Sequence, residues 1–135
     1  MPKPSERASA ISPIAPTDSQ IMSNWRALAA ASLQDALRQE VSPLTRAAAA
    51  WEVGYVSALQ VLGPGAGTRY AHPDVQVLEE VRNKLDWPDS AIQAGKWFME
   101  NRYEMFAFDT QQQERIAQKL LAWAHCMRRA AEGAQ

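Results

Sequence analysis

The sequence predicts an all-α protein, a compact bundle of about five helices with antiparallel neighbours, preceded by a flexible N-terminal tail. Apolar residues recur at gaps of three and four, the spacing of one helix face, over most of the chain after residue 18. Capping residues, glycines and prolines interrupt that spacing at intervals, and no stretch shows a convincing β-strand pattern. Short connections between apolar stripes favour antiparallel packing.

With 135 residues, the chain has the length of about one domain. Residues 1–17 hold four prolines among small and polar residues, which predicts a proline-rich flexible tail. Residues 18–135 are predicted to form the helical bundle domain.

Composition and charge restrict the function classes. The net charge of −1 provides no long-range attraction to nucleic-acid phosphates or anionic lipid. The single cysteine, Cys126, excludes an internal disulfide. No apolar run reaches the roughly 18 residues that span a bilayer, and the N-terminus has no apolar signal segment. We therefore expect a cytoplasmic protein with no membrane partner.

The first two helices are predicted on either side of Ser42-Pro43. The first begins near Asp18 and carries an apolar stripe as far as Leu37. Serine is a good N-cap and proline suits a first turn, so Ser42-Pro43 begins the second helix, which Gly63-Pro64 ends. Its alanine run, 47–50, lets a neighbour approach closely, which makes it the predicted central helix.

Three more helices follow a glycine-rich segment, 63–67, which we expect to be a plain loop because it lacks the spacing and the Lys-Ser/Thr of a phosphate-binding loop. The third helix begins after 72–74 and ends at Trp87-Pro88. The fourth continues to Arg102, and an apolar link, 105–108, follows it. Asp109-Thr110 caps the last helix, with glutamines three residues later in capping-box positions.

No catalytic constellation is recognisable. A cysteine–histidine nucleophile would have to pair Cys126 with His72, because His125 points about 100° away from its neighbour on the helix. No His-x-x-x-His or Glu-x-x-His spacing places two metal ligands on one helical face. The sequence therefore predicts no catalytic residue, no metal and no cofactor, and it favours a protein that is not an enzyme.

One set of candidate ligand-binding residues lies on the second helix. Glu52 falls among apolar residues, where an unpaired buried carboxylate is costly. It therefore lies at the edge of the apolar stripe, pairs with Arg46, Arg69 or Arg102, or contacts a ligand. Together with Tyr55 it could anchor a small molecule in a pocket between helices.

A second set follows the fourth helix. The planar guanidinium of Arg102, next to Tyr103, could hold a phosphate or carboxylate, with Arg69 assisting. This set predicts RNA or nucleotide as a partner. The simpler alternative is that Arg102 caps the helix end and Tyr103 packs against it.

The tryptophans suggest an interface. Five are many for a chain of this length, and Trp87 and Trp97 fall outside the inward-facing stripes. Trp97, Phe98 and Met99 make the fourth helix apolar around much of its circumference, and large exposed aromatics often anchor a partner. We therefore predict an interface that includes Trp87, Trp97 and Phe98, either in a homodimer or with a protein partner.

The order of these features resembles the HEPN superfamily, small helical bundles common in bacteria and archaea. The resemblance covers about residues 28–132 and depends on the hairpin 28–63, with its alanine-rich segment Arg46–Tyr55, and on Glu100–Tyr103 before a long last helix. It implies a bacterial helical bundle that often dimerises and, in active members, a metal-independent RNase.

Active members carry an arginine, a polar residue, and a histidine four to six residues beyond the arginine. Residues 103–108 after Arg102 contain no histidine, and residues 84–88 after Arg82-Asn83 contain none either. Acid–base catalysis would lack its usual group, so the resemblance implies a degenerate, non-cleaving member.

The function predicted from the sequence is thus a non-catalytic helical interaction or dimerisation module. The alternatives are an RNA- or nucleotide-binding HEPN-like protein, and a protein that binds a small molecule between its helices.

Overall fold

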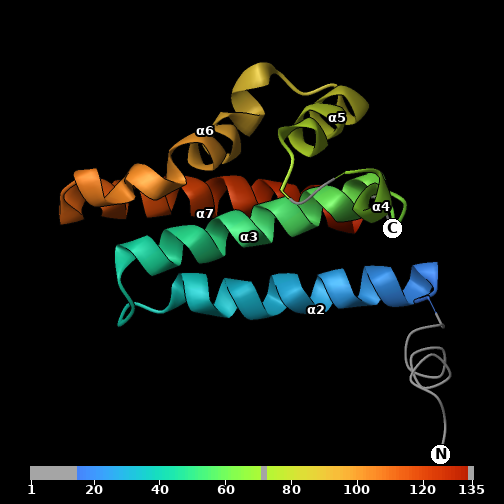
Figure 1. The fold of residues 1–135 in the computed structure, drawn as a ribbon, viewed down its shortest axis with the longest axis horizontal. Coiled ribbons are helices and arrows are strands. Elements are labelled where there is room, and N and C mark those ends of the chain that lie inside the picture. Colours follow the sequence, from blue (N-terminus) through green and yellow to red (C-terminus); the bar gives the residue numbers. More distant parts are fainter. Residues whose placement is uncertain (1–14, 71–72, 134–135) are drawn as a thin grey trace, which may run out of the picture.

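A computed structural model describes residues 15–70 and 73–133, in which all regular structure is helical (Figure 1). The predicted all-α bundle is therefore confirmed. The predicted tail lies largely outside the described residues, as does His72. None of the described helices combines the length and apolar character needed to cross a bilayer.

The first two described helices begin where the sequence predicts. Helix α2 (Asp18–Leu37) follows Thr17, whose side chain accepts a hydrogen bond from the Gln20 amide while the Gln20 side chain accepts one from the Thr17 amide. Helix α3 (Pro43–Leu62) follows Ser42, whose hydroxyl accepts a hydrogen bond from a first-turn amide. These local bonds satisfy amide groups that a helix start leaves unpaired.

The later elements differ more from expectation. The glycine-rich segment is not a plain loop, because Gly63 turns the chain with a φ of 96° into a short helix. The predicted fourth helix is interrupted by 3-10 turns at both ends. In chain order the elements are α4 (Ala66–Arg69), α5 (Val75–Leu85), η1 (Asp89–Ile92), α6 (Gln93–Asn101), η2 (Arg102–Ala107) and α7 (Thr110–Gly133).

Helices α2, α3 and α7 run along the bundle, and α5 and α6 lie across them on one side (Figure 1). The expected antiparallel packing is observed between α2 and α3 but does not extend to α7, which runs parallel to α3 (Figure 1). Arg46 near the start of α3 bonds Glu114 near the start of α7, and Gly54 halfway along α3 lies against Trp123. The chain between the two helices returns through α5 and α6, which allows the parallel arrangement.

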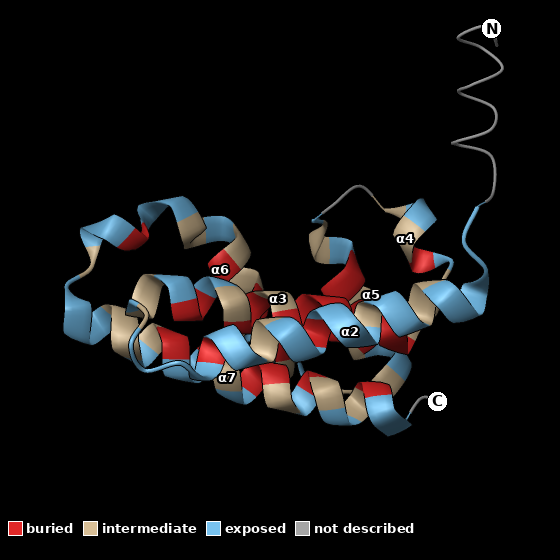
Figure 2. Ribbon diagram, turned by 90° about the horizontal axis from the view of Figure 1, so that it is seen from below, coloured by how far each residue is buried: buried red, intermediate tan, exposed pale blue. Residues whose placement is uncertain are grey.

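The core is centred on α3, whose residues from Val53 to Val61 are all buried (Figure 2). The Trp51 ring stacks on Tyr55 with centroids 4.8 Å apart, and its indole nitrogen donates to the Gly95 carbonyl at 3.1 Å. These contacts attach α6 to the central helix and so fix the position of the surface between α6 and α7.

A left-handed residue ends α5. Asp86 has a φ of 54°, and its amide donates to the last-turn carbonyls of Arg82 and Asn83. Because glycine adopts this conformation without steric cost, Asp86→Gly is expected to raise the free energy of unfolding by about 0.5 kcal/mol, despite the added freedom of the unfolded chain. Urea unfolding measures the change. The control Asp35→Gly, inside α2, should lower stability by up to about 1 kcal/mol, and a loss of similar size for Asp86→Gly would contradict the assignment.

Candidate interaction groove

The structure does not bring together the arginines predicted to bind a ligand. Arg69 ends α4 and pairs with Glu80 at 3.4 Å, whereas Arg102 begins η2, the orange segment after α6 at the other end of the bundle (Figure 1). The Arg102 guanidinium carbon lies 4.9 Å from the centre of the Tyr103 ring. One small ligand, such as a single nucleotide, therefore cannot contact both arginines in this fold.

Of the two ligand-binding residues predicted on the central helix, Tyr55 has a structural role in the described fold. Tyr55 is buried, and its hydroxyl accepts a hydrogen bond of 3.0 Å from the Asp74 amide at the start of α5. Burial raises the pKa of Tyr55 above its ordinary value. Glu52 is half-buried one turn earlier. Tyr55 thus positions α5.

The three predicted interface residues occupy different environments. Phe98 is only 5% exposed and packs near Trp51, with ring centroids 6.1 Å apart, so it belongs to the core and is out of reach of a partner. Trp87 is half-buried and lines a shallow hollow beside Cys126. Trp97 is half-buried and lines the groove between α6 and α7. The groove that Trp97 lines has two aromatic residues in its wall, Trp97 and Phe108, whereas Trp87 is the single aromatic residue that lines the other hollow.

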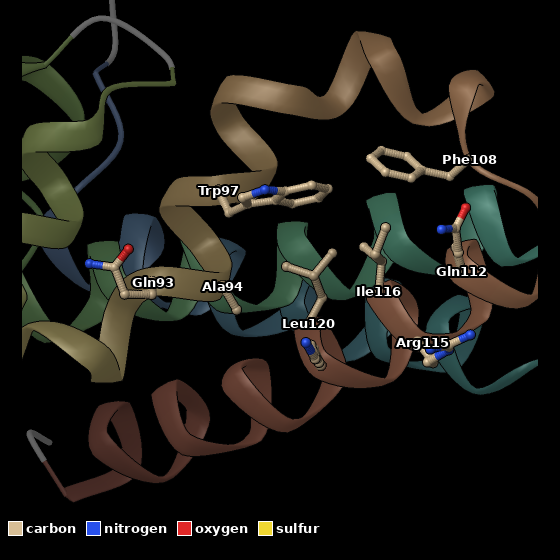
Figure 3. A pocket seen from close by; sticks show the side chains of 9 residues that line it. Gln93, Ala94, Trp97, Phe108, Gln112, Arg115, Ile116 and Leu120 are labelled. Atoms are coloured by element: carbon tan, nitrogen blue, oxygen red, sulfur yellow. The ribbon is translucent and has the colours of Figure 1, made fainter.

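This groove has a volume of about 520 Å³ and an apolar floor. The centroids of the Trp97 and Phe108 rings lie 5.9 Å apart, with the ring planes at 51°, and Ile116 and Leu120 point towards the rings from α7 (Figure 3). The residues that line the groove are Gln93, Ala94, Trp97, Phe108, Gln112, Arg115, Ile116, Lys119 and Leu120. Such a mixture of aromatic and aliphatic side chains suits an apolar occupant.

The groove also carries positive charge. Arg115 and Lys119 are exposed on α7, four residues apart on one helix face. Neither forms an ion pair with an acid in the described part of the chain, whereas Glu114, directly before Arg115, is paired with Arg46. The groove therefore combines an apolar floor with an unneutralised basic edge.

Two aromatic side chains project into solvent from η2, directly before the groove residue Phe108. Tyr103 is 82% exposed and Phe106 is 81% exposed, and we refer to these two residues as the η2 aromatic pair. A 3-10 helix has three residues per turn, so side chains three apart point the same way. Met105 is fully buried on the opposite side and fixes this orientation.

The backbone around the aromatic pair is held firmly. The side-chain amide of Gln113 donates to the carbonyls of Met105 and Phe108, at 2.9 and 3.2 Å, and so ties the link to α7. Asp109 and Gln112 exchange hydrogen bonds that cap α7, as the sequence predicts. The two exposed rings thus project from a turn whose backbone is hydrogen-bonded to α7, and this attachment keeps them in solvent.

No protein-family model, curated protein or solved structure matches this chain. The described residues also contain no group of three or more histidine, cysteine, aspartate or glutamate side chains close enough to hold a metal ion. The groove and the aromatic pair must therefore be interpreted from their own geometry.

The sequence predicts Trp97 at an interface and Tyr103 at a ligand site, but it does not single out Phe106 or the α7 side of the groove. Phe106 falls within the predicted apolar link, three residues after Tyr103 and two before Phe108. In a 3-10 turn, residues three apart lie on the same side. That period places Phe106 on the side of Tyr103 and not on the side of the buried Met105.

Proposed function

We propose that the protein is a non-catalytic dimerisation module, in which the η2 aromatic pair of one copy packs into the α6–α7 groove of a second copy. The observation that carries the proposal is the exposure of Tyr103 and Phe106, each above 80%, on an anchored turn beside an apolar groove. Burying one large apolar side chain contributes about 1.5–3 kcal/mol, which gives these rings a reason to associate.

Charge supports a second copy as the occupant. Glu104 is exposed between the two aromatic residues, and neither Arg115 nor Lys119 at the groove is paired with a described acid. If the pair enters the groove, Glu104 approaches these cations, and opposite charges favour the correct partner and orientation.

In a dimer with a two-fold axis, the contact between the η2 aromatic pair of one copy and the groove of the other occurs twice. In a symmetric dimer both copies use one self-complementary patch, and here the projection and the groove are adjacent segments of one chain. The resemblance to HEPN bundles, which often dimerise, agrees with this proposal, and the family assignment itself stays a prediction.

The test is the oligomeric state of Phe106→Ser. The unaltered protein is expected to elute as a dimer in size exclusion with light scattering, and Phe106→Ser as a folded monomer with unchanged helix content. The control Leu28→Ser removes another exposed apolar side chain, on α2 and outside the groove, and should remain dimeric. A monomeric parent protein, or an unchanged dimer in Phe106→Ser, would overturn the proposal.

Charge reversal tests the orientation. Glu104→Lys and Lys119→Glu should each weaken the dimer, and the double variant should recover part of the loss if the two residues face each other across the interface. Absorbance at 260 nm during the same run examines the RNA alternative. An excess of 260 nm absorbance that Arg115→Gln removes would assign the groove to nucleic acid instead.

A further inference from the structure

A second, smaller cavity lies where α2, α3 and α7 meet. It has a volume of about 130 Å³ and shares no lining residue with the α6–α7 groove. Its lining consists of Arg26, Ala29, Ser57, Gln60, Arg128, Ala131 and Glu132. The small alanines of α2 and α7 leave the space, and polar or charged groups supply the rest of its wall.

Ser57 is the first sign that this cavity takes a ligand. Its side chain is 1% exposed, and its hydroxyl has no hydrogen-bond partner among the described residues. A serine inside a helix often bonds a carbonyl of the preceding turn, but this one does not. A buried hydroxyl without a hydrogen-bond partner costs free energy, so an occupant that accepts a hydrogen bond from Ser57 would stabilise the fold.

The charges around the cavity indicate the chemistry of that occupant. Arg26 and Arg128 approach it from α2 and α7, and neither forms an ion pair within residues 15–70 and 73–133. Glu132 is the single acid in the lining. That carboxylate and the C-terminal turn of α7 disfavour an anion, but two guanidinium groups leave the lining with a net positive charge.

We propose that this cavity binds one small oxyanion, of the phosphate class, through Ser57, Arg26 and Arg128. The hydroxyl donates one hydrogen bond, and the planar guanidinium groups donate paired hydrogen bonds to anionic oxygens. The volume of about 130 Å³ has room for a few water molecules, which suits a single phosphate group and is small for a whole nucleotide. The bound anion connects three helices and therefore stabilises the folded protein.

The test is a melting-temperature titration with inorganic phosphate, compared with chloride at equal ionic strength. A ligand that binds only the folded state raises the melting temperature as its concentration increases. The unaltered protein should show this rise. Ser57→Ala and Arg128→Gln should each weaken phosphate binding about tenfold or more, because each loses a hydrogen bond to a charged group. Arg115→Gln, outside the cavity, should keep the full rise.

Two outcomes would overturn the site. The first is a melting temperature that responds to phosphate no more than to chloride. In that case Ser57→Ala should simply be more stable, because it lacks an unpaired hydroxyl. The second is a phosphate response that Ser57→Ala and Arg128→Gln leave unchanged, which would place the anion elsewhere on the surface.

A parallel titration with AMP distinguishes the source of the phosphate group. A rise with inorganic phosphate alone would identify the free ion as the ligand. A rise with AMP as well, lost in Ser57→Ala, would identify a phosphate monoester whose remaining part lies outside the cavity. Because dimerisation uses none of these residues, failure of either proposal leaves the other intact.

Discussion

Gly54→Ala is expected to lower the free energy of unfolding by about 2 kcal/mol, although alanine is normally the better helix former. A Cβ atom at Gly54 would overlap ring carbons of Trp123, and one at Gly95 would overlap the same ring from α6. Overpacking a core costs about 1–3 kcal/mol. Trp123 is only 5% exposed, and Gly54 of α3 and Gly95 of α6 both lie close to its ring. The ring therefore has little space to move, and we expect an overpacking cost near the upper end of this range. The helix preference for alanine offsets about 1 kcal/mol.

Urea unfolding of three variants tests this packing. Gly54→Ala and Gly95→Ala should both lower the midpoint. Gly65→Ala is the matched control, because no neighbour lies within 4 Å of a Cβ there and its φ of −66° suits alanine. That change should be neutral or slightly stabilising.

A double variant isolates the ring contact. Trp123→Phe makes space beside Gly54 and loses no hydrogen bond, since the Trp123 indole nitrogen has no partner among the described residues. The cost of Gly54→Ala should therefore be smaller in the Trp123→Phe background. Equal costs in both backgrounds, or a stabilising Gly54→Ala, would show that the ring does not lie between the two helices.

The helices could be predicted because their boundaries are determined by neighbouring residues. Thr17 with Gln20, Ser42 with Pro43, and Asp109 with Gln112 each form a cap within three residues. Such signals need no knowledge of the tertiary fold. Gly54 was not singled out from the sequence, because a glycine inside a helical pattern does not show which neighbour packs against it.

The candidate site could be predicted only in part, because its residues depend on where other helices lie. Trp97 and Phe98 are adjacent on a helix of nine residues, and the sequence does not say which of them faces α3. The structure buries Phe98 and leaves Trp97 at the groove. Phe106 is exposed on a 3-10 turn in which Met105 is buried, and the sequence did not show that a 3-10 turn replaces the regular helical period there.

The ion pairs also depend on where other helices lie, so the sequence did not predict them. The sequence offered Arg46 as one of three partners for Glu52, but the structure pairs Arg46 with Glu114, 68 positions away. That pair exists because α3 and α7 begin side by side, and this parallel arrangement has no signature in either helix alone. Its consequences can be measured directly.

Arg46→Met is expected to lower the melting temperature by several degrees at neutral pH. The guanidinium donates to both carboxylate oxygens of Glu114, at 3.0 and 2.6 Å, and its Nε donates to the Val41 carbonyl at 3.1 Å. The Arg46 side chain is 9% exposed and that of Glu114 is 34% exposed, so the guanidinium bears most of the desolvation in this pair. Removing Arg46 leaves the half-buried Glu114 carboxylate and the Val41 carbonyl without this partner, which costs more than an exposed pair contributes.

The matched control is Arg38→Met in an exposed pair. Arg38 and Glu40 lie 4.0 Å apart with side chains 58% and 74% exposed, and a pair of this kind contributes little to stability. Arg38→Met should therefore leave the melting temperature nearly unchanged. A similar loss in both variants would mean that the change of charge, and not the buried contact, determines the effect.

The loss of melting temperature in Arg46→Met should depend on pH, and the titration of Glu114 determines whether it grows or shrinks in acid. Hydrogen bonds from Arg46 hold the pKa of Glu114 below its usual value of 4.5. A carboxylate with a lowered pKa in the folded state stabilises that state above the unfolded pKa and loses this effect as the pH falls through the folded pKa. The difference in melting temperature between the parent protein and Arg46→Met should therefore be largest above about pH 5 and shrink in stronger acid.

Glu79 does not obscure this comparison. Its pKa is also lowered, mainly by the hydrogen bond from Lys96, and its protonation destabilises both proteins in acid. Because that pair joins α5 to α6 and does not include Arg46, its contribution cancels in the difference between the two melting temperatures. A difference that stayed constant from neutral pH into acid would mean that Glu114 does not carry the charge that Arg46 compensates, and the parallel contact between α3 and α7 would then have to depend on the apolar packing around Trp123 alone.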